Sequence, residues 1–215
     1  DTPLRGLSRY GPDGWQTVTC PTAAPPSADV SDAAQTPAAV WLATPRGISR
    51  FDGATWRTYD ARDGLPDAPA NALAAAGEAV YAATDAGVAR FDGAAPDGRW
   101  QMISAAPARD LAIAPNGDLW VTDGLTVALV GKDAASALPL PTAVRGLAAT
   151  NDAVWLATPD GVLRYDGHWT VFTADDGLPG LDVTAIGAAA GGGVWAATSG
   201  SANGIEIVQF DGRRW

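Results

Sequence analysis

Short apolar segments that carry one aromatic residue recur along this chain at nearly even intervals. Their aromatic positions are separated by 40, 39, 35 and 40 residues. A period near 40 with several short strands in each period is typical of a β-propeller blade. The five segments are residues 40–44 (VWLAT), 80–84 (VYAAT), 119–122 (LWVT), 154–158 (VWLAT) and 194–198 (VWAAT).

Each aromatic segment has neighbours that also repeat. A small, apolar stretch such as residues 110–114 or 183–187 precedes it, and a Gly-led stretch ending in Phe-Asp-Gly or Tyr-Asp-Gly follows it. A further segment then begins with a tryptophan. We call these four predicted strands a, b, c and d, from the inner edge of a blade outward. The Gly-led strands c are residues 47–53, 87–93, 161–167 and 204–212, and strands d begin at Trp56, Trp100, Trp169 and Trp215.

The pattern predicts an all-β fold, a single β-propeller domain over residues 1–215. The expected number of four-stranded blades is about six, and the repeats allow five to seven. The first blade is expected to be incomplete, because residues 6–10 match strand c and 15–18 match strand d with no a or b before them. Either an irregular six-bladed ring closes by another route, or the chain is part of a longer propeller. The repeats lie near 1–20, 29–60, 70–104, 109–140, 145–174 and 181–215.

Two segments depart from the pattern. Residues 72–76 are rich in alanine, and propensity alone favours a helix there. Other repeats have more β-prone residues in this position, so the repeat predicts strand a. The repeat near 109–140 has no tryptophan at the start of strand d. We therefore expect that blade to be the least regular one.

The charge of the chain changes the picture in one respect. The formal net charge is -10, which argues against nucleic acid as a partner because binding phosphates requires a cationic surface. Only Glu78 and Glu206 are glutamates and only Lys132 is a lysine. Aspartate favours turns, and ten Asp-Gly dipeptides occur, a sequence typical of two-residue type I′ hairpins. Much of the acidity is thus explained by turns between strands.

Two longer motifs resemble a known family. Asp63-Gly64-Leu65-Pro66, followed by residues 80–84 and Gly87, resembles the two-component regulator propeller repeat, and residues 176–179 begin a second match that runs to 205. Proteins of this family are typically extracytoplasmic sensor regions that bind glycans. The resemblance implies an extracytoplasmic location, periplasmic or at the cell surface, and a binding role. Signalling does not carry over, since no kinase, DNA-binding or membrane-spanning segment is apparent, and we expect no direct membrane insertion.

Little in the sequence points to catalysis. His168, the single histidine, lies in an Asp-Gly turn, and Cys20, the single cysteine, has no partner for a disulfide or a zinc site. We therefore expect no catalytic residues, no metal site and no cofactor. A catalytic pair of aspartates or a lyase-type activity remains a distant alternative. Weak calcium binding at residues 60–64 or 175–177 is less expected than plain turn stabilisation.

The predicted ligand or partner site is the face onto which the b–c and d–a loops open. A mixed polar rim suits either a protein partner or a polar, glycan-like ligand, and two roles remain open: a sensor-type binding module, or an accessory subunit of a larger, membrane-bound assembly. The repeated tryptophans and the arginines of strand c are expected to serve packing and ion pairs. The candidate binding residues are Arg46, Arg62, Asp63, Asp85, Asp160 and Asp176, with Asp67 and Asp175 beside them.

Overall fold

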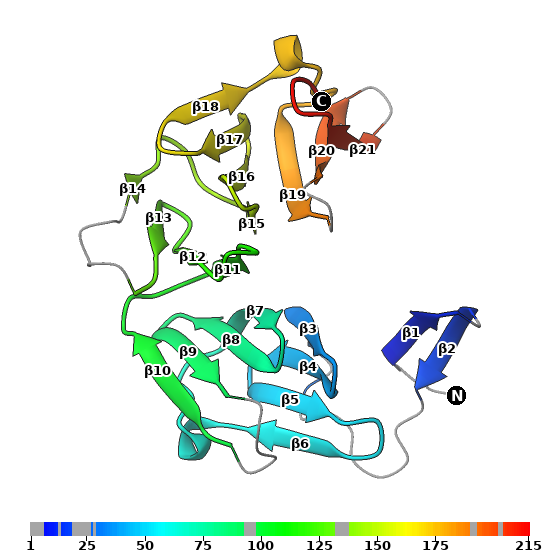
Figure 1. The fold of residues 1–215 in the computed structure, drawn as a ribbon, viewed down its shortest axis with the longest axis vertical. Helices are drawn as coiled ribbons and strands as arrows, with labels where there is room; N and C mark the ends of the chain where they lie inside the picture. The colour runs from blue at the N-terminus through cyan, green and yellow to red at the C-terminus, as the bar shows by residue number, and fades with distance from the viewer. Residues whose placement is uncertain are drawn as a thin grey trace.

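The computed structural model describes residues 7–12, 14–18, 27, 29–92, 98–131, 138–189, 193–201 and 204–215. Almost all regular structure in these ranges is antiparallel strand, in six small sheets that follow one another around an open arc (Figure 1). The first two strands form one hairpin at one end of the arc, and the last three form a sheet at the other end. The outer ends of the chain therefore face each other across an opening (Figure 1).

Each sheet is built from strands that are consecutive in sequence. Four sheets have four strands, the last has three, and the first has two, within the described ranges. Their strands are β1 (Leu7–Gly11) and β2 (Gly14–Val18); β3 (Asp32–Thr36), β4 (Ala39–Thr44), β5 (Gly47–Phe51) and β6 (Trp56–Tyr59); β7 (Ala70–Ala76), β8 (Ala79–Thr84), β9 (Gly87–Phe91) and β10 (Trp100–Ser104); β11 (Asp110–Ile113), β12 (Leu119–Thr122), β13 (Thr126–Leu129) and β14 (Leu138–Pro139); β15 (Gly146–Ala149), β16 (Val154–Thr158), β17 (Gly161–Tyr165) and β18 (Trp169–Phe172); β19 (Asp182–Ala188), β20 (Val194–Ser201) and β21 (Gly204–Phe210).

The first strands of successive sheets lie side by side along the inside of the arc: β3 contacts β7, β7 contacts β11, β11 contacts β15 and β15 contacts β19. Sheets that radiate from a shared inner edge are the blades of a β-propeller. The all-β propeller predicted from the repeats is confirmed, and so is the incomplete first blade. The irregular repeat is the one expected, since β14 has only two residues.

The alanine-rich run at residues 72–76 lies in strand β7. Ala72 and Leu73 are buried, at 5% and 6% exposure, and the strand pairs with β8 from Ala70 to Ala76. Small side chains suit an inner strand that is crowded by both neighbouring sheets. Tertiary packing therefore overrides the helical propensity of alanine.

The turns between strands c and d differ from the expected type. Among the described residues only glycines have positive φ, whereas a type I′ turn requires positive φ at both central positions. In the β5–β6 turn the Asp52 carboxylate instead accepts hydrogen bonds from the backbone N–H groups of Ala54 (2.9 Å) and Thr55 (2.8 Å). Asp211 does the same for Arg213 and Arg214. The two-residue type I′ expectation is wrong, because aspartate stabilises longer turns through its side chain.

Four aromatic side chains form the core between the sheets β3–β6 and β7–β10. In this Trp41 cluster, the Trp41 ring stacks on Tyr59 with centroids 5.6 Å apart and meets Phe91 at 5.0 Å and Trp100 at 5.9 Å. The same four positions recur between β15–β18 and β19–β21. This Trp155 cluster consists of Trp155, Phe172, Phe210 and Trp215, with corresponding distances of 5.7, 5.0 and 6.1 Å.

Two aspartates join the inner strands of neighbouring sheets. The Asp32 carboxylate on β3 accepts a hydrogen bond from the backbone N–H of Leu73 on β7, at 2.8 Å. Asp110 on β11 makes the equivalent bond with Leu147 on β15, also at 2.8 Å. Burial raises the pKa of Asp110 to about 6. Within the described ranges, the structure has no helix with the length and apolar character needed to cross a membrane.

Candidate functional site

Two loops of similar construction lie on the face where the b–c and d–a loops open. The Asp60 loop (residues 60–69) connects β6 to β7, and the Thr173 loop (residues 173–181) connects β18 to β19. Each begins with a short 3-10 turn, η1 (Ala61–Asp63) or η3 (Ala174–Asp176), followed by a left-handed glycine. Both contain the Asp-Gly-Leu-Pro motif, so this motif specifies a loop conformation.

The glycine and leucine of the motif hold each loop against the next sheet. Gly64 has φ 93°, and a Cβ there would lie 2.2 Å from the carbonyl oxygen of Trp100. Gly177 has φ 96°, with the Trp215 oxygen at 2.3 Å from the same hypothetical atom. Leu65 and Leu178 are buried at 7% and 2% exposure. Only glycine fits this close approach, and the leucine anchors the loop to the aromatic core.

The motif aspartates are engaged within their own loops. Asp63 Oδ2 accepts a hydrogen bond from the Asp60 backbone N–H at 3.1 Å, and its other oxygen lies 3.7 Å from the Arg57 guanidinium. Asp176 Oδ2 accepts the Thr173 backbone N–H at 2.9 Å. These are capping interactions of the 3-10 turns. The chemistry of Asp63 and Asp176 is therefore largely committed to loop structure.

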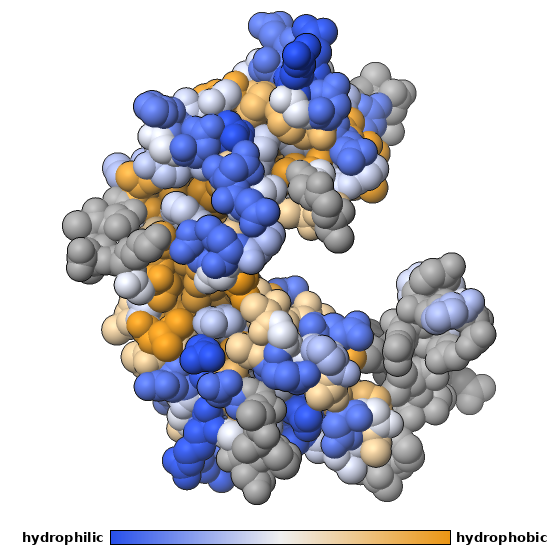
Figure 2. All heavy atoms as spheres, viewed as in Figure 1, coloured by the Kyte–Doolittle hydropathy of each residue, from blue (hydrophilic) through white to orange (hydrophobic). Residues whose placement is uncertain are grey.

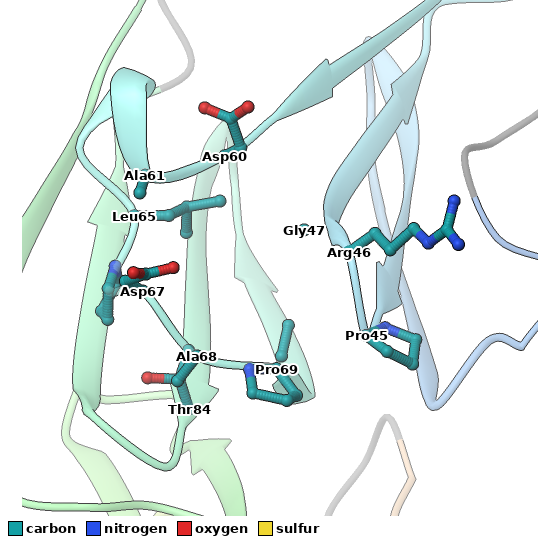
Figure 3. A pocket seen from close by; sticks show the side chains of 12 residues that line it. Pro45, Arg46, Gly47, Asp60, Ala61, Leu65, Asp67, Ala68, Pro69 and Thr84 are labelled. Atoms are coloured by element: carbon teal, nitrogen blue, oxygen red, sulfur yellow. The ribbon is translucent and has the colours of Figure 1, made fainter.

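A pocket of about 260 Å³ opens between the Asp60 loop and the β4–β5 loop. Its floor includes the buried Leu65 and Thr84, and its walls carry the charged residues Asp60, Asp67 and Arg46. In Figure 3 the Asp67 and Leu65 side chains extend from the loop toward the pocket, whereas the Arg46 guanidinium extends away from the Asp60 loop. The charge closest to the pocket is thus carboxylate rather than guanidinium.

The six candidate residues from the sequence lie on the predicted face but in different repeats. Arg46, Arg62 and Asp63 belong to the loops of sheet β3–β6, and only Arg46 lines the pocket. Asp85 follows β8, where its carboxylate accepts a hydrogen bond from the Asn71 amide at 2.9 Å. Asp160 and Asp176 belong to the loops of the β15–β18 sheet, two sheets further along the arc.

Of the two carboxylates that line the pocket, sequence reasoning placed Asp67 on the rim beside the candidate residues and did not select Asp60 for binding. Asp60 precedes the Asp-Gly-Leu-Pro motif, and Asp67 follows it directly. The difference between the two motifs is the signal that identifies these positions as variable. The Thr173 loop has Thr173 and Gly180 in these positions, and Asp160 stands where the first repeat has Arg46. Rim residues that differ between repeats of identical loop construction are candidates for function.

The other residues considered for chemistry have structural surroundings. His168 is exposed in the β17–β18 turn, at the end of the sheet opposite the b–c and d–a loops. The strand c arginines whose side chains the structure describes form the expected ion pairs, with Arg90 3.5 Å from Asp92 and Arg164 bonded to Asp152 at 3.1 Å and to Asp166. The side chain of Arg9 lies outside the described part of the structure. In the part of the chain that the structure describes, no three His, Cys, Asp or Glu side chains gather as metal ligands would.

The fold is shared with several solved structures. The extracellular domain of a hybrid two-component system, BT4673 from B. thetaiotaomicron, superposes with a TM-score of 0.70 at 16% identity, over 97% of this chain and 30% of that one. Virginiamycin B lyase from Staphylococcus aureus gives 0.68 at 17% identity, over 97% and 78%. YCF48 bound to D1 peptide gives 0.65 at 17% identity, over 95% and 72%.

These likenesses define the protein by its class, a β-propeller. The sensor domains among these structures share the fold of this chain at 16% sequence identity. The chain spans about 30% of the length of those sensor domains. No protein-family model matches the sequence, and no curated protein matches it significantly.

Proposed function

We propose that this protein is a non-catalytic, extracytoplasmic propeller module that binds a polar partner on the rim formed by its b–c and d–a loops. The observation that carries the proposal is the pocket beside the Asp60 loop. Two repeats build the same loop on the same aromatic core, yet only the first places Asp60 and Asp67 around a hollow of about 260 Å³. Asp60 caps the 3-10 turn of its loop through the Arg62 backbone N–H. The loop does not require Asp67, because the second repeat has Gly180 there.

The size and charge of the pocket indicate what enters it. Sites for drug-sized ligands usually have about 300 to 1,000 Å³. A hollow of about 260 Å³ therefore accepts one side chain or one sugar unit of a larger partner. The Asp67 carboxylate at its wall favours a cationic group or a cluster of hydroxyl donors, whereas the Asp60 carboxylate extends away from the hollow in Figure 3 and caps its own 3-10 turn. We infer a protein segment that presents lysine or arginine, and a glycan is the competing ligand.

Known propellers support both binding and the absence of catalysis. YCF48 has been seen bound to a peptide, and sensor propellers occur as extracellular domains. A virginiamycin B lyase variant with one histidine changed to alanine is described as catalytically inactive. The single histidine of this chain, His168, lies at the opposite end of the sheets from the pocket. The rim therefore has no imidazole to perform such chemistry.

The proposal is tested with peptides and sugars on the purified chain. A panel of short lysine- and arginine-containing peptides, the same peptides with acetylated lysine, and a panel of oligosaccharides would be titrated by calorimetry. For the best ligand we expect Asp67→Gly, which introduces the residue of the second loop, to weaken binding about tenfold, the usual effect of losing one charge-assisted contact. Its melting temperature should be unchanged, because Asp67 is exposed.

Gly180→Asp is the matched control, since it adds a carboxylate to the Thr173 loop, whose surroundings have Thr173 in place of Asp60 and Asp160 in place of Arg46. It should leave the affinity unchanged. If no peptide or sugar binds, or if Asp67→Gly and Gly180→Asp have equal effects, the rim pocket is not the binding site. Tight binding of oligosaccharides alone would replace the protein partner with a glycan.

A further inference from the structure

A second hollow lies between the last two sheets, on the face opposite the rim pocket. It has a volume of about 510 Å³, within the usual range for sites that bind small molecules. The a–b and c–d turns open onto this face, and hydrophilic residues gather at this end of the arc, near the C-terminus (Figures 1 and 2). The lining combines charged and aromatic side chains, and we call the hollow the Arg213 pocket. Its main lining residues are Asp152, Trp155, Arg164, Phe210, Asp211 and Arg213.

The carboxylates of this pocket are bonded within the protein. Asp152 accepts hydrogen bonds from the Thr150 hydroxyl at 2.8 Å and from the Arg164 guanidinium at 3.1 Å. Asp211 accepts the backbone N–H groups of Arg213 and of the next residue, each at 2.8 Å. A carboxylate that already has these donors gains less from a cationic ligand than a free one does. The acidic groups therefore do not define what the pocket binds.

The Arg213 guanidinium has no such structural use. Arg213 is exposed, and among the described residues its side chain has no hydrogen bond and no ion pair within 4.0 Å. Backbone hydrogen bonds lower the pKa of Asp211, and the Arg213 charge adds to this effect at longer range. The turn forms without an arginine, because Asp52 makes the same two bonds to the backbone of the β5–β6 turn. The residues at the corresponding place after Asp-Gly in other repeats are Ala54, Ala94 and His168.

The aromatic wall of the pocket is held in place by the protein itself. The Arg164 guanidinium lies 5.4 Å from the centroid of the Trp155 ring and donates hydrogen bonds to Asp152 and Asp166. The Trp155 ring also meets Phe210, with centroids 5.0 Å apart. A wall that is already ordered lowers the cost of binding a ligand. The pocket thus offers one free guanidinium beside an ordered aromatic surface.

We propose that the Arg213 pocket binds a small organic anion, a carboxylate attached to an apolar group. The carboxylate pairs with the Arg213 guanidinium, whose planar fork of donors matches two carboxylate oxygens. The apolar group lies against the rings of Phe210 and Trp155, which line the pocket. This preference is opposite to that of the rim pocket, where Asp67 favours a cation. The two faces therefore bind different ligands, and the failure of one site would not affect the other.

Titration with small acids tests this proposal. Phenylacetate and hexanoate would be titrated into the purified chain by calorimetry, with phenylacetamide and hexanamide as uncharged analogues of similar size. We expect each acid to bind at least tenfold more tightly than its amide, because only the acid forms an ion pair with Arg213. Arg213→Ala, which introduces the residue found at position 54, should weaken binding of the acids at least tenfold. Its melting temperature should be unchanged, because Arg213 is exposed.

Arg214→Ala is the matched control, since it removes the same charge from the neighbouring position. The Arg214 guanidinium donates to the Asp175 carbonyl oxygen at 3.4 Å and does not line the pocket. This variant should change the affinity less than twofold, and Asp67→Gly on the other face should not change it. Equal losses for Arg213→Ala and Arg214→Ala would indicate general electrostatic attraction instead of a site. Equal binding of acids and amides, or no binding of either acid up to about 10 mM, would also overturn the proposal.

Discussion

The Trp41 and Trp155 regions have the same core but different surfaces. Corresponding ring distances in the two clusters agree within 0.2 Å, for example 5.9 Å for Trp41 and Trp100 against 6.1 Å for Trp155 and Trp215. Above them, the first loop presents Asp60 and Asp67, whereas the second presents Thr173 and Gly180. The comparison shows that the repeat specifies packing strictly and leaves the rim free to vary. Function is therefore to be sought where the two regions differ.

The cores differ in one hydrogen bond. The indole N–H of Trp155 donates to the Thr150 hydroxyl at 3.4 Å. The indole N–H of Trp41 is buried without a partner among the described residues. A buried N–H without a partner reduces stability, whereas a satisfied one does not. The two tryptophans are thus equivalent in shape and unequal in their polar contact.

The largest expected effect comes from emptying either cluster. Trp41→Ala and Trp155→Ala should each lower the free energy of unfolding by about 3 to 5 kcal/mol, since each leaves a cavity at the centre of four rings. Denaturant titration followed by circular dichroism would measure both. A loss below about 1 kcal/mol at either position would show that its cluster does not hold the two sheets together.

Phenylalanine substitutions sharpen this test. Trp155→Phe removes the bond to Thr150, and Trp41→Phe removes an N–H without a partner. We expect Trp155→Phe to cost about 1 kcal/mol more than Trp41→Phe. Equal losses would mean that the two indole N–H groups are in equivalent surroundings.

The loop glycines should give the next largest effect. Gly64→Ala and Gly177→Ala each place a Cβ at 2.2 to 2.3 Å from a tryptophan carbonyl oxygen in a left-handed conformation. We expect each to reduce the free energy of unfolding by about 3 kcal/mol, at the upper end of the range for backbone strain. Thermal and denaturant unfolding of the two variants would provide the measurement.

Gly53→Ala is the control for the loop glycines. Its φ is 99°, and no atom lies within 4 Å of the added Cβ. It should therefore cost only the conformational part, about 1 to 2 kcal/mol. If Gly64→Ala is no worse than Gly53→Ala, the close approach of loop and sheet does not contribute.

The smallest effect concerns two aspartates of the inner strands. Asp32 joins β3 to β7 in the first region, and Asp110 joins β11 to β15, the first strand of the second region. Burial raises the pKa of Asp110 to about 6. A raised pKa favours the protonated carboxyl in the folded protein, so the contribution of Asp110 to stability is complete below about pH 4 and is lost as the pH rises through about 6. Between pH 4 and 7 the wild type should lose about 1 to 3 kcal/mol relative to Asp110→Asn.

Asp52→Asn provides a contrast in the same experiment. Backbone hydrogen bonds from Thr55 and Ala54 lower the pKa of Asp52 to about 2. Folded and unfolded forms are then both ionised above pH 5, so this substitution should not alter the slope between pH 5 and 7. A slope that is the same in wild type and Asp110→Asn would show that Asp110 is not held in a buried environment.

Most of the architecture was predictable because propeller blades repeat in the sequence. The spacing of Trp41, Trp155 and Trp195 predicted the sheets, and the repeat correctly assigned the alanine-rich residues 72–76 to a strand. The turn type was predicted wrongly at Asp52. The dipeptide Asp-Gly does not reveal whether the aspartate adopts positive φ or bonds to the backbone of a longer turn, because both depend on where the flanking strands end.

The proposed binding site was predictable only as a face. The alternation of strands and loops placed Arg46, Asp63 and Asp176 on the same side of the propeller. Sequence alone could not show that Asp63 and Asp176 cap their own turns, since both roles use the same exposed carboxylate. Nor could it show that Asp67, which it placed on this face, lines a hollow between the β4–β5 loop and the Asp60 loop.

The sequence by itself determined the repeat, the strand order and the buried aromatic positions. These are local properties: alternation and turn residues recur in every unit and require the same packing each time. The tertiary structure decided which carboxylates line a pocket, which ones cap a turn, and that Trp195 is exposed where Trp41 and Trp155 are buried. Those features depend on how neighbouring sheets meet, and identical segments such as residues 40–44 and 154–158 acquire different surroundings from their places in the arc.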